Sequence, residues 1–382
     1  MQSKFYDVAV IGAGVFGAWT AYQLNRAGAS VLLLDAYGPG NSRASSGGES
    51  RILRLGYGPA EIYTRSAQRS YQLWQEFFAG YQTAAPLFRQ TGMLFLGREE
   101  DPYCEATLMN LQKVGARCER LTQVQLRERF PQLNFDGVEW AVLETDAGAL
   151  MARRAVEAVA AKARANGVEY STEAVAATIA CGDVHTTSGK EIRATHFVFA
   201  CGPWLPKLFP ELLAGRIHVT RQEIVFLGVP PGDDSFKPPK MPIWIDFNDL
   251  IYGLPDLENR GLKVAIDAHG PEFDPDHGQR IVSAESIAAV REYVRRRLPA
   301  LVDAPITETR VCQYENTSNG DFLIDRHPER ENVWLVGGGS GHGFKHGPAV
   351  GEYVAAMIAG TRQAEPRFSL ATKARVQQRE VY

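Results

Sequence analysis

The feature that most constrains the fold is a short unit near the N-terminus. Residues 6–11 form an apolar run of strand length, and Gly12, Gly14 and Gly17 follow it in the spacing G-x-G-x-x-G. A helical pattern then continues to residue 28, and a second apolar run ends on Asp35. This order of strand, glycine-rich turn, helix, strand and acidic residue is typical of a Rossmann-like unit, in which the two strands lie in a parallel sheet.

Each residue of this motif has a physical task. Gly12 permits the tight turn, Gly14 allows a pyrophosphate to approach the backbone, and Gly17 allows the helix to pack closely on the strand. The first N–H groups of the helix would bind phosphate, and Asp35 would accept a hydrogen bond from a ribose hydroxyl. The alternative is an ordinary tight turn without a ligand, which the complete context disfavours. The motif alone does not distinguish FAD from NAD.

Length and composition set the outer limits. Dividing the 382 residues by about 150 residues per domain gives about two domains, and 45% hydrophobic residues are enough for a sizeable core. The net charge of −3 argues against a general nucleic-acid binder. No apolar run is long enough for a transmembrane helix, and no signal-peptide pattern begins the chain, so we expect a cytoplasmic protein without membrane contacts. The five cysteines, which contain no Cys-x-x-Cys pair, predict neither a disulfide framework nor a metal site: Cys104, Cys118, Cys181, Cys201 and Cys312.

The rest of the chain divides into segments without repeats. We expect helices at 151–166, at 283–298 and from about Pro348 to Gly360, and strands at 195–200, around 251, at 262–266 and at 333–336. Residues 311–315 and 322–324 look like a hairpin across the turn 317–320. A second glycine-rich turn at 337–343 follows a strand and precedes a helix. A cofactor domain built from both ends of the chain, with a substrate domain inserted, would explain this arrangement.

Five stretches now carry a resemblance to a known family: 7–35, 47–57, 252–263, 312–328 and 339–345. The chain resembles the monomeric sarcosine oxidase and N-methyltryptophan oxidase group of the D-amino-acid-oxidase-like FAD-dependent oxidoreductases. The resemblance implies an α/β (α+β) fold, with a Rossmann-like FAD-binding domain and a discontinuous substrate domain built on a mixed β-sheet. We expect the FAD-binding domain at 1–80, 150–215 and 308–382, and the substrate-binding domain at 81–149 and 216–307.

The resemblance also implies an activity. The family is expected to oxidise secondary amines, here an N-substituted amino acid with a free carboxylate, such as a sarcosine-like, N-methyl or fructosyl amino acid. Hydride would pass to flavin N5, the imine would hydrolyse, and oxygen would be reduced to hydrogen peroxide. We expect a monomer whose partners are this small molecule and oxygen. The alternatives are a flavin dehydrogenase with a quinone or protein acceptor, a non-catalytic flavin-binding subunit, and a nicotinamide dehydrogenase.

The resemblance assigns catalytic and cofactor residues. Lys263 matches the lysine that activates oxygen, Arg51 an arginine that stabilises the reduced flavin, and Cys312 the cysteine that carries FAD through a thioether link. Gly47 stands where the family has a histidine, so attachment could be slow or incomplete. The residues expected to contact FAD are Gly12, Gly14, Val15, Phe16, Gly17, Asp35, Ser45, Arg51, Gly202, Trp204, Cys312, Gly339, Gly341, His342, Gly343, Phe344 and Lys345.

A further group matches the family's substrate site. Arg54 and Lys345 correspond to the pair that holds the substrate carboxylate, which suits the planar fork of arginine. Tyr252 and Tyr314 would line the pocket, although aromatic packing on strands explains them equally well. Asp267 departs from the sarcosine oxidases, which have histidine there, and agrees with the fructosyl amino acid oxidases, which have an acid. It favours a polar N-substituent; the alternative is a solvated aspartate at a strand end.

Overall fold

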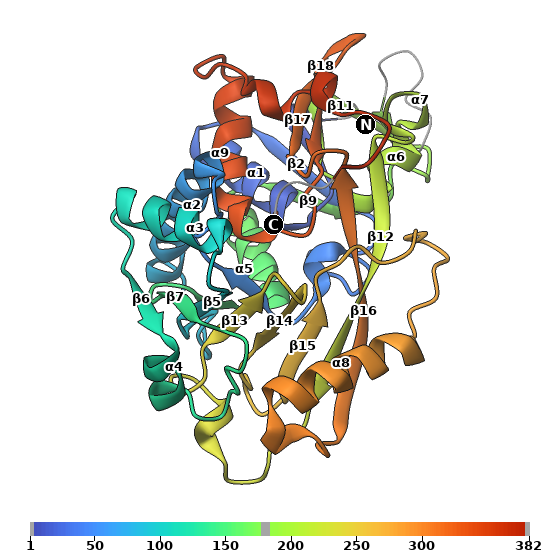
Figure 1. Cartoon of the computed structure of the whole chain (residues 1–382). Coiled ribbons are helices and arrows are strands. Elements are labelled where there is room, and N and C mark those ends of the chain that lie inside the picture. The colour runs from blue at the N-terminus through green and yellow to red at the C-terminus, as the bar shows by residue number, and fades with distance from the viewer. Residues whose placement is uncertain (1–3, 177–183, 379–382) are drawn as a thin grey trace.

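The computed structural model of the chain describes residues 4–176 and 184–378, so Cys181 lies outside the described residues. The cysteines within those ranges are free thiols: Cys104, Cys118, Cys201 and Cys312. Two large β-sheets dominate the fold, one in the upper half and one in the lower half of Figure 1. The two long strands β12 (Ile217–Leu227) and β16 (Ile306–Thr317) extend along one side of the molecule between these halves.

The first sheet confirms the expected Rossmann-like arrangement. Its strands run in the order β17-β18-β11-β1-β2-β9, and β10 pairs with β11. The pairs β18–β11, β11–β1, β1–β2 and β2–β9 are parallel, while β17 and β10 are antiparallel to their neighbours. The bounds are β1 Phe5–Ile11, β2 Val31–Asp35, β9 Glu169–Thr172, β10 Val184–His185, β11 Glu191–Phe199, β17 Leu323–His327 and β18 Arg330–Gly337.

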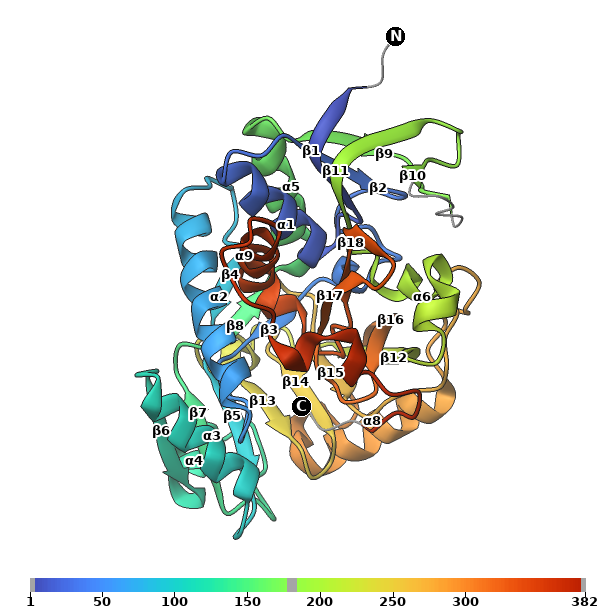
Figure 2. The same cartoon turned by 90° about the horizontal axis from the view of Figure 1, so that it is seen from above.

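Alternation of side chains along the strands explains why both faces of this sheet are covered. Val8 and Val10 of β1 face one hydrophobic cluster, whereas Ala9 and Ile11 face another. Figure 2 shows α1, α5 and α9 together on the first face and α6 on the other. The bounds are α1 Val15–Arg26, α5 Ala152–Ala165, α6 Leu205–Leu208, α7 Pro210–Leu213 and α9 Gly347–Ile358. The N-terminal and C-terminal parts of the fold therefore meet, because α1 packs directly on α9.

The second sheet is mixed, as expected. Its order is β16-β12-β15-β14-β13-β5-β7-β6, antiparallel except for the parallel pair β13–β5. Its strands are β5 Met93–Gly97, β6 Cys118–Thr122, β7 Trp140–Glu144, β12 Ile217–Leu227, β13 Ile243–Asp246, β14 Ile251–Leu254, β15 Leu262–Ile266 and β16 Ile306–Thr317. Helices α8 Ala284–Arg297 and α4 Gln123–Arg129 cover its outer face through a second core cluster. Ser283 caps α8 by accepting from the Ser286 N–H.

A small antiparallel sheet lies between these parts. It consists of β3 Arg51–Leu53, β8 Gly148–Leu150 and β4 Phe88–Gln90. Two helices complete the fold on this side, α2 Glu61–Ala79 and α3 Pro102–Lys113. Position 51 is thus placed on a strand that begins directly after the serine- and glycine-rich loop.

The predicted hairpin of 311–315 with 322–324 is wrong. The turn itself forms, with Gly320 at φ +77°. However, β16 pairs along its length with β12 in the second sheet, whereas β17 pairs with β18 in the first sheet. The turn therefore carries the chain from one sheet to the other, because each strand finds its hydrogen-bond partner in a different sheet. The expected domain limit at 307/308 falls inside β16, and the division into domains stays a prediction.

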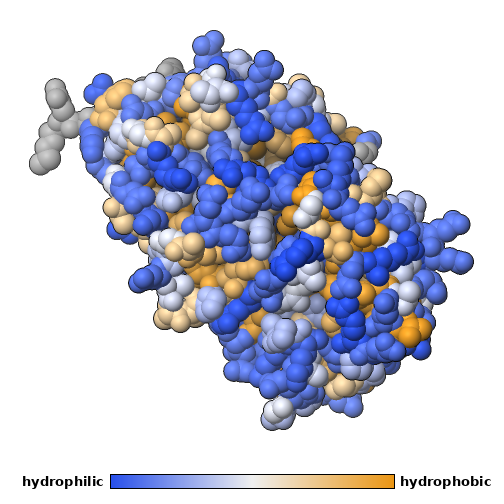
Figure 3. All heavy atoms as spheres, turned by 90° about the vertical axis from the view of Figure 1, so that its left-hand side faces the viewer, coloured by the Kyte–Doolittle hydropathy of each residue, from blue (hydrophilic) through white to orange (hydrophobic). Residues whose placement is uncertain are grey.

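The face over α2, α3 and β6 is mostly hydrophilic, with hydrophobic residues in scattered areas (Figure 3). Met109 of α3 and Val124 of α4 are among the few large apolar side chains that are exposed. Within the described ranges, no helix is both long and apolar enough to span a membrane.

Candidate functional site

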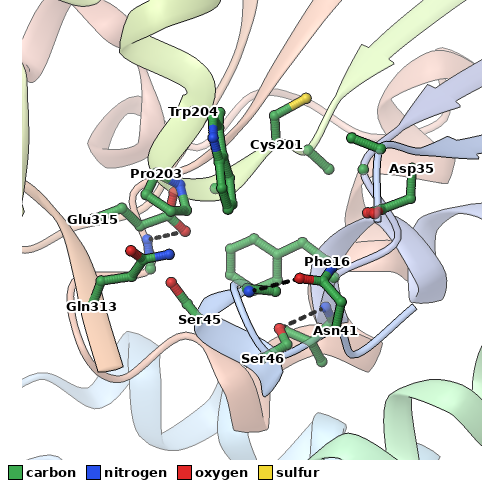
Figure 4. Close-up of a pocket in the computed structure, with 18 of the residues that line it drawn as sticks. Phe16, Asp35, Asn41, Ser45, Ser46, Cys201, Pro203, Trp204, Gln313 and Glu315 are labelled. Atoms are coloured by element: carbon green, nitrogen blue, oxygen red, sulfur yellow. Dashed lines mark hydrogen bonds between the residues drawn. The ribbon is translucent and has the colours of Figure 1, made fainter. Parts of the chain in front are cut away.

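A cavity of about 420 Å³ opens at the carboxyl ends of β1 and β2. Figure 4 shows Asp35, Trp204, Ser45 and Glu315 on different sides of it. Most of the residues expected to contact a cofactor line it: Gly12, Gly14, Val15, Phe16, Asp35, Ser45, Arg51, Gly202, Trp204, Cys312, Gly339, Gly341, Gly343 and Phe344. Three others, Gly17, His342 and Lys345, lie outside this lining.

Glycines are required in the first turn because other backbone atoms approach it closely. Gly12 has φ +101°, and a Cβ there would overlap the backbone of Ala200. A Cβ on Gly17 would overlap the carbonyl oxygen of Gly12, so this glycine serves the packing of α1 on the turn rather than the cavity wall. The N-cap Gly14 supplies no side-chain cap to α1, and the Ser46 hydroxyl accepts from the Val15 N–H at 3.0 Å.

Asp35 is held in place at the end of β2. One carboxylate oxygen accepts from the Ala13 N–H at 2.7 Å, and the other accepts from the N–H groups of Tyr37 and Gly38 at 2.8 and 2.9 Å. Burial raises the pKa of Asp35, while these three donors lower it. The carboxylate is therefore fixed at the edge of the large cavity, next to the glycine-rich turn that follows β1.

A smaller cavity of about 70 Å³ adjoins the large one. All the residues expected to be catalytic or to bind substrate line it: Arg51, Arg54, Tyr252, Lys263, Asp267, Tyr314 and Lys345. The two cavities share Arg51, Cys312, Tyr314, Gly341 and Phe344 in their walls. Cys312 and Tyr314 come from β16 in the second sheet, while Gly341 and Phe344 follow β18 in the first. The candidate site therefore forms where the two sheets meet.

Arg51 and Cys312 are in direct contact at this junction. The guanidinium donates to Cys312 Sγ at 3.1 Å, to the Ser45 carbonyl at 2.7 Å and to the Ser50 carbonyl at 2.8 Å. Lys263 donates from Nζ to the same Ser50 carbonyl at 3.3 Å. Burial, together with the nearby charge of Arg51, lowers the pKa of Lys263 to about 7. An adjoining negative charge would raise this pKa again and keep the lysine protonated.

Arg54 and Lys345 are buried basic side chains in the wall of the smaller cavity, 4% and 5% exposed. Arg54 donates to the Gly56 carbonyl, lies over the ring of Tyr57 at 4.3 Å from its centroid, and donates to the hydroxyl of Tyr103. Lys345 donates to the Tyr57 hydroxyl and to the His342 carbonyl, both at 2.9 Å. Burial and the charge of Arg54 lower the pKa of Lys345. Two buried basic groups side by side favour an anionic ligand, because each is stabilised as a cation by a negative charge between them.

Asp267 is buried in the same cavity rather than solvated at a strand end. The Tyr314 hydroxyl donates to its carboxylate at 3.5 Å. Burial raises the pKa of the other wall tyrosine, Tyr252, to about 12, so its hydroxyl keeps its proton. An acid and two hydroxyls thus share the wall of the smaller cavity with the two basic side chains.

The surroundings of Gly47 differ from what the family histidine at this position leads us to expect. A Cβ at this position would overlap the carbonyl of Asn41, and residue 47 does not line either of the cavities described here. Its carbonyl accepts from the guanidinium of Arg310 at 2.6 Å and from Arg153. The loop therefore leaves no room for a larger side chain at position 47, and the two arginines hold its backbone in place.

Several residues near the site were not anticipated. Glu144, at the end of β7, accepts from the N–H groups of Leu55 and Gly56 at 2.7 and 3.1 Å, and burial raises its pKa to about 7. Tyr57 falls within a stretch that carried the resemblance, but Tyr103 and Glu144 lie in a region without any motif. A buried acid at the end of an apolar strand was the one available signal for Glu144.

Comparison with known proteins identifies the family. A family model described as FAD dependent oxidoreductase matches residues 7–357. The chain belongs to this family. It is 31% identical over 370 residues to the peroxisomal sarcosine oxidase of Mus musculus, covering 92% of this chain and 91% of that protein. It is also 31% identical over 365 residues to the N-methyl-L-tryptophan oxidase of Yersinia pestis, covering 93% and 95%. The L-proline dehydrogenase of P. horikoshii shares its fold with a TM-score of 0.83, at 22% identity over 96% of this chain and 97% of that one.

The larger cavity fits the FAD that membership of this family implies. Within residues 4–176 and 184–378, Ser45 Oγ and Glu315 Oε2 are buried without a hydrogen-bond partner, and both residues line the cavity. Burial raises the pKa of Glu315 to about 7, while its other oxygen accepts from the Gly339 N–H at 3.3 Å. Orphaned buried polar atoms call for a ligand with hydroxyl or amide groups. The sugar and polyol parts of FAD supply such groups.

Proposed function

We propose that the protein is an FAD-dependent oxidase of an N-substituted amino acid with a free carboxylate. The observation that carries this proposal is the pair of buried basic side chains, Arg54 and Lys345, in a cavity whose wall also contains Lys263 and Cys312. The similarity to sarcosine and N-methyl-L-tryptophan oxidases supports the same reaction class. When bound, FAD supplies the acceptor for the two electrons and the hydrogen removed from the carbon beside the amine.

The chain's own residues would hold FAD in stated places. The N-terminus of α1 would bind the pyrophosphate, and Asp35 would bind a ribose hydroxyl. Ser45 and Glu315 would satisfy their orphaned oxygens on the polyol. Cys312 would form the thioether link, because its sulfur stands at the junction of the two cavities.

The substrate site would bind the carboxylate on Arg54 and Lys345. The cavity wall contains four basic side chains, Arg51, Arg54, Lys263 and Lys345, against the two acids Glu223 and Asp267. Such an excess of positive charge disfavours a protonated amine, so the substrate would react as the neutral base. This protonation state leaves the nitrogen lone pair free to assist the loss of hydride from the adjacent carbon.

Lys263 would act in the second half of the reaction. Its buried side chain donates to the same Ser50 carbonyl as Arg51, and both residues line the smaller cavity. A fixed positive charge in a water-poor site stabilises the negative charge that develops on oxygen as it accepts electrons. This supports oxygen as the acceptor in preference to a quinone or a protein.

Asp267 would set the preference for the N-substituent. A buried carboxylate beside the Tyr314 hydroxyl suits hydroxyl groups on the substrate better than a methyl group. Fructosyl-glycine and sarcosine share a carboxylate and a secondary amine and differ in this substituent alone.

The test is peroxide release by the purified holoenzyme in air with these two substrates. Faster turnover of fructosyl-glycine would support Asp267 as the residue that binds the hydroxyls. Faster turnover of sarcosine would retain the oxidase and reject this role. Substrates that bleach the flavin without oxygen but release no peroxide in air would overturn the oxidase in favour of a dehydrogenase.

A further inference from the structure

A continuous chain of hydrogen bonds leads away from Lys345. Its ammonium donates to the Tyr57 hydroxyl at 2.9 Å, and that hydroxyl lies 2.8 Å from His346 Nε2. His346 Nδ1 lies 2.9 Å from the hydroxyl of Ser66 on α2. Lys345, Tyr57 and His346 are buried, whereas Ser66 is partly exposed. The chain therefore links the smaller cavity to the outer side of the molecule at α2.

Each member of this chain can both accept and release a proton. Burial, together with the charge of Lys345, lowers the pKa of His346, so its imidazole is neutral, with one nitrogen as donor and the other as acceptor. Burial raises the pKa of Tyr57, which keeps its hydroxyl intact between transfers. Lys345 would not hold its proton firmly without an anion beside it, because it is buried next to Arg54.

We propose that Ser66, His346 and Tyr57 form a proton relay that charges Lys345 when the substrate carboxylate binds. The proposal rests on the carboxylate site of the proposed function. In the resting state the Tyr57 hydroxyl donates to the neutral Lys345 amine, His346 Nε2–H donates to Tyr57, and the Ser66 hydroxyl donates to Nδ1. A proton taken from water by Ser66 moves each hydrogen one step inward. Lys345 becomes an ammonium group that donates to the Tyr57 hydroxyl, as in the structure, and both hydrogen bonds of His346 reverse their direction.

The charges around Lys345 agree with uptake on anion binding. The charged or titratable groups that act on Lys345 and His346 are Arg54, Glu144, Asp267 and His342, together with each other. Arg54 opposes a second positive charge, and the two acids favour it. A carboxylate placed between Arg54 and Lys345 adds one negative charge at hydrogen-bond distance, which raises the pKa of Lys345. Binding of the anion and uptake of the proton are therefore linked.

The probe is acetate, which has a carboxylate but no amine to oxidise. Acetate binding to the holoenzyme is measured by calorimetry between pH 7 and 9 in phosphate and in Tris, whose ionisation enthalpies differ. We expect uptake that rises toward one proton per acetate as pH increases within this range. Stopped-flow mixing with a pH indicator gives the rate of that uptake.

Two variants interrupt the relay away from the ligand. His346→Gln keeps a hydrogen-bonding side chain but cannot pass a proton, and should slow uptake at least tenfold. Ser66→Ala removes the outer hydroxyl, should slow uptake at least threefold, and provides the test if the buried substitution prevents folding. Both should leave the number of protons and the acetate affinity within twofold of the unmodified enzyme. The matched control is Ser70→Ala, one turn further along α2, whose hydroxyl accepts from the Ala349 N–H at 3.2 Å outside the relay.

The outcomes separate this proposal from the proposed function. Acetate that binds without proton uptake at every pH would overturn the relay and leave the carboxylate site standing. Uptake as fast in both variants as in the control would also overturn it. Acetate that does not bind at all would contradict the carboxylate site, and the relay with it.

Discussion

At the scale of single residues, Cys312 offers the sharpest test of FAD attachment. Its sulfur lies at the junction of the two cavities, 3.1 Å from an Arg51 nitrogen. We expect the yellow colour to stay with the acid-precipitated protein and to move to the supernatant in Cys312→Ala. The control is Cys201→Ala, because Cys201 lines the same large cavity but lies at its other end, where its thiol contacts the Ile11 carbonyl. Colour that leaves the unmodified protein under these conditions would rule out a covalent link.

Lys263 predicts a pH dependence confined to the reaction with oxygen. Since its pKa is lowered to about 7, the protonated form is lost as pH rises through that value unless a negative charge adjoins it. We expect the rate with oxygen in the unmodified enzyme to fall as pH rises through the pKa of Lys263, which an adjoining negative charge shifts above about 7. Lys263→Met should lower this rate by about 100-fold or more and remove its pH dependence, as loss of one preorganised charge does elsewhere.

Rapid mixing separates the two halves of the reaction for Lys263→Met. Anaerobic reduction by substrate should stay within about threefold, because the carboxylate site is intact. The exposed Lys240→Met is the control. An equal loss in both halves would instead mean that Lys263 supports the structure of the site.

Most of the residues that a local motif marked in the sequence lie in the walls of the two cavities, while their roles stay a prediction. Arg51 and Arg54 lie on or next to one short strand, and Lys345 follows a glycine-rich turn, so their neighbours in the sequence reveal them. Tyr103 and Glu144 reach the same cavity region from segments about 50 and 90 residues beyond Arg54 in the sequence. No local pattern marks them, because their position follows from the packing of α3 and β7 rather than from spacing.

At the scale of elements, the packing of α1 on the first turn depends on Gly17. A Cβ at this position would overlap the Gly12 carbonyl, and neither backbone can move without displacing α1. We expect Gly17→Ala to lower the free energy of unfolding by about 3 kcal/mol or more, in the range of overpacked cores. The control is Gly80→Ala at the end of α2, where an added Cβ meets only ordinary contacts; its cost should stay below about 1 kcal/mol. Thermal unfolding of both variants provides the comparison.

The raised pKa of Glu144, which binds the loop after β3, predicts how the stability of the protein depends on pH. Its pKa is raised from 4.5 to about 7 by burial, so the folded state holds a proton that the unfolded state has lost. Linkage then requires stability to fall as pH rises from about 4.5 to about 7. At 1.36 kcal/mol per pKa unit, the loss is about 3 kcal/mol.

The variant Glu144→Gln removes this titration while it keeps one acceptor for the Leu55 and Gly56 N–H groups. Its stability should therefore fall less than that of the unmodified protein between pH 4.5 and pH 7, measured by urea unfolding. Exposed Glu157→Gln should follow the unmodified protein throughout. Parallel curves for all three proteins would contradict a raised pKa at Glu144.

The elements themselves were predicted well where side-chain periodicity decides them. The helices at 152–165, 284–297 and 347–358 and the strands at 251–254 and 262–266 agree with expectation to within a few residues. The false hairpin at 311–324 has a physical reason. A turn signal and two apolar runs fix where strands begin and end, but the partner of each strand is chosen by long-range contacts. Here β16 pairs with a strand about 90 residues earlier, and β17 pairs with the strand that follows it.

At the scale of the whole molecule, the cofactor cavity joins the two large sheets. Its wall combines the turns after β1, β11 and β18 of the first sheet with Cys312 to Glu315 of the second. A ligand bound across such a junction stabilises both sheets together, because neither side alone forms the cavity. The sequence indicated that both ends of the chain build one sheet, but not that β16 places Cys312 in the other.

This junction predicts how the protein unfolds with and without FAD. If Cys312→Ala releases its FAD, the same protein can be compared empty and refilled. Ligand at 100 times its dissociation constant adds about 2.7 kcal/mol to the stability of the state that binds it. For a chain of this size we expect a rise in Tm of about 3 to 5 °C. Because the cavity wall comes from both sheets, the refilled protein should unfold in one transition by near-UV circular dichroism and by flavin fluorescence alike. Release of FAD well before the loss of tertiary structure would show instead that the sheets separate around the cofactor before either unfolds.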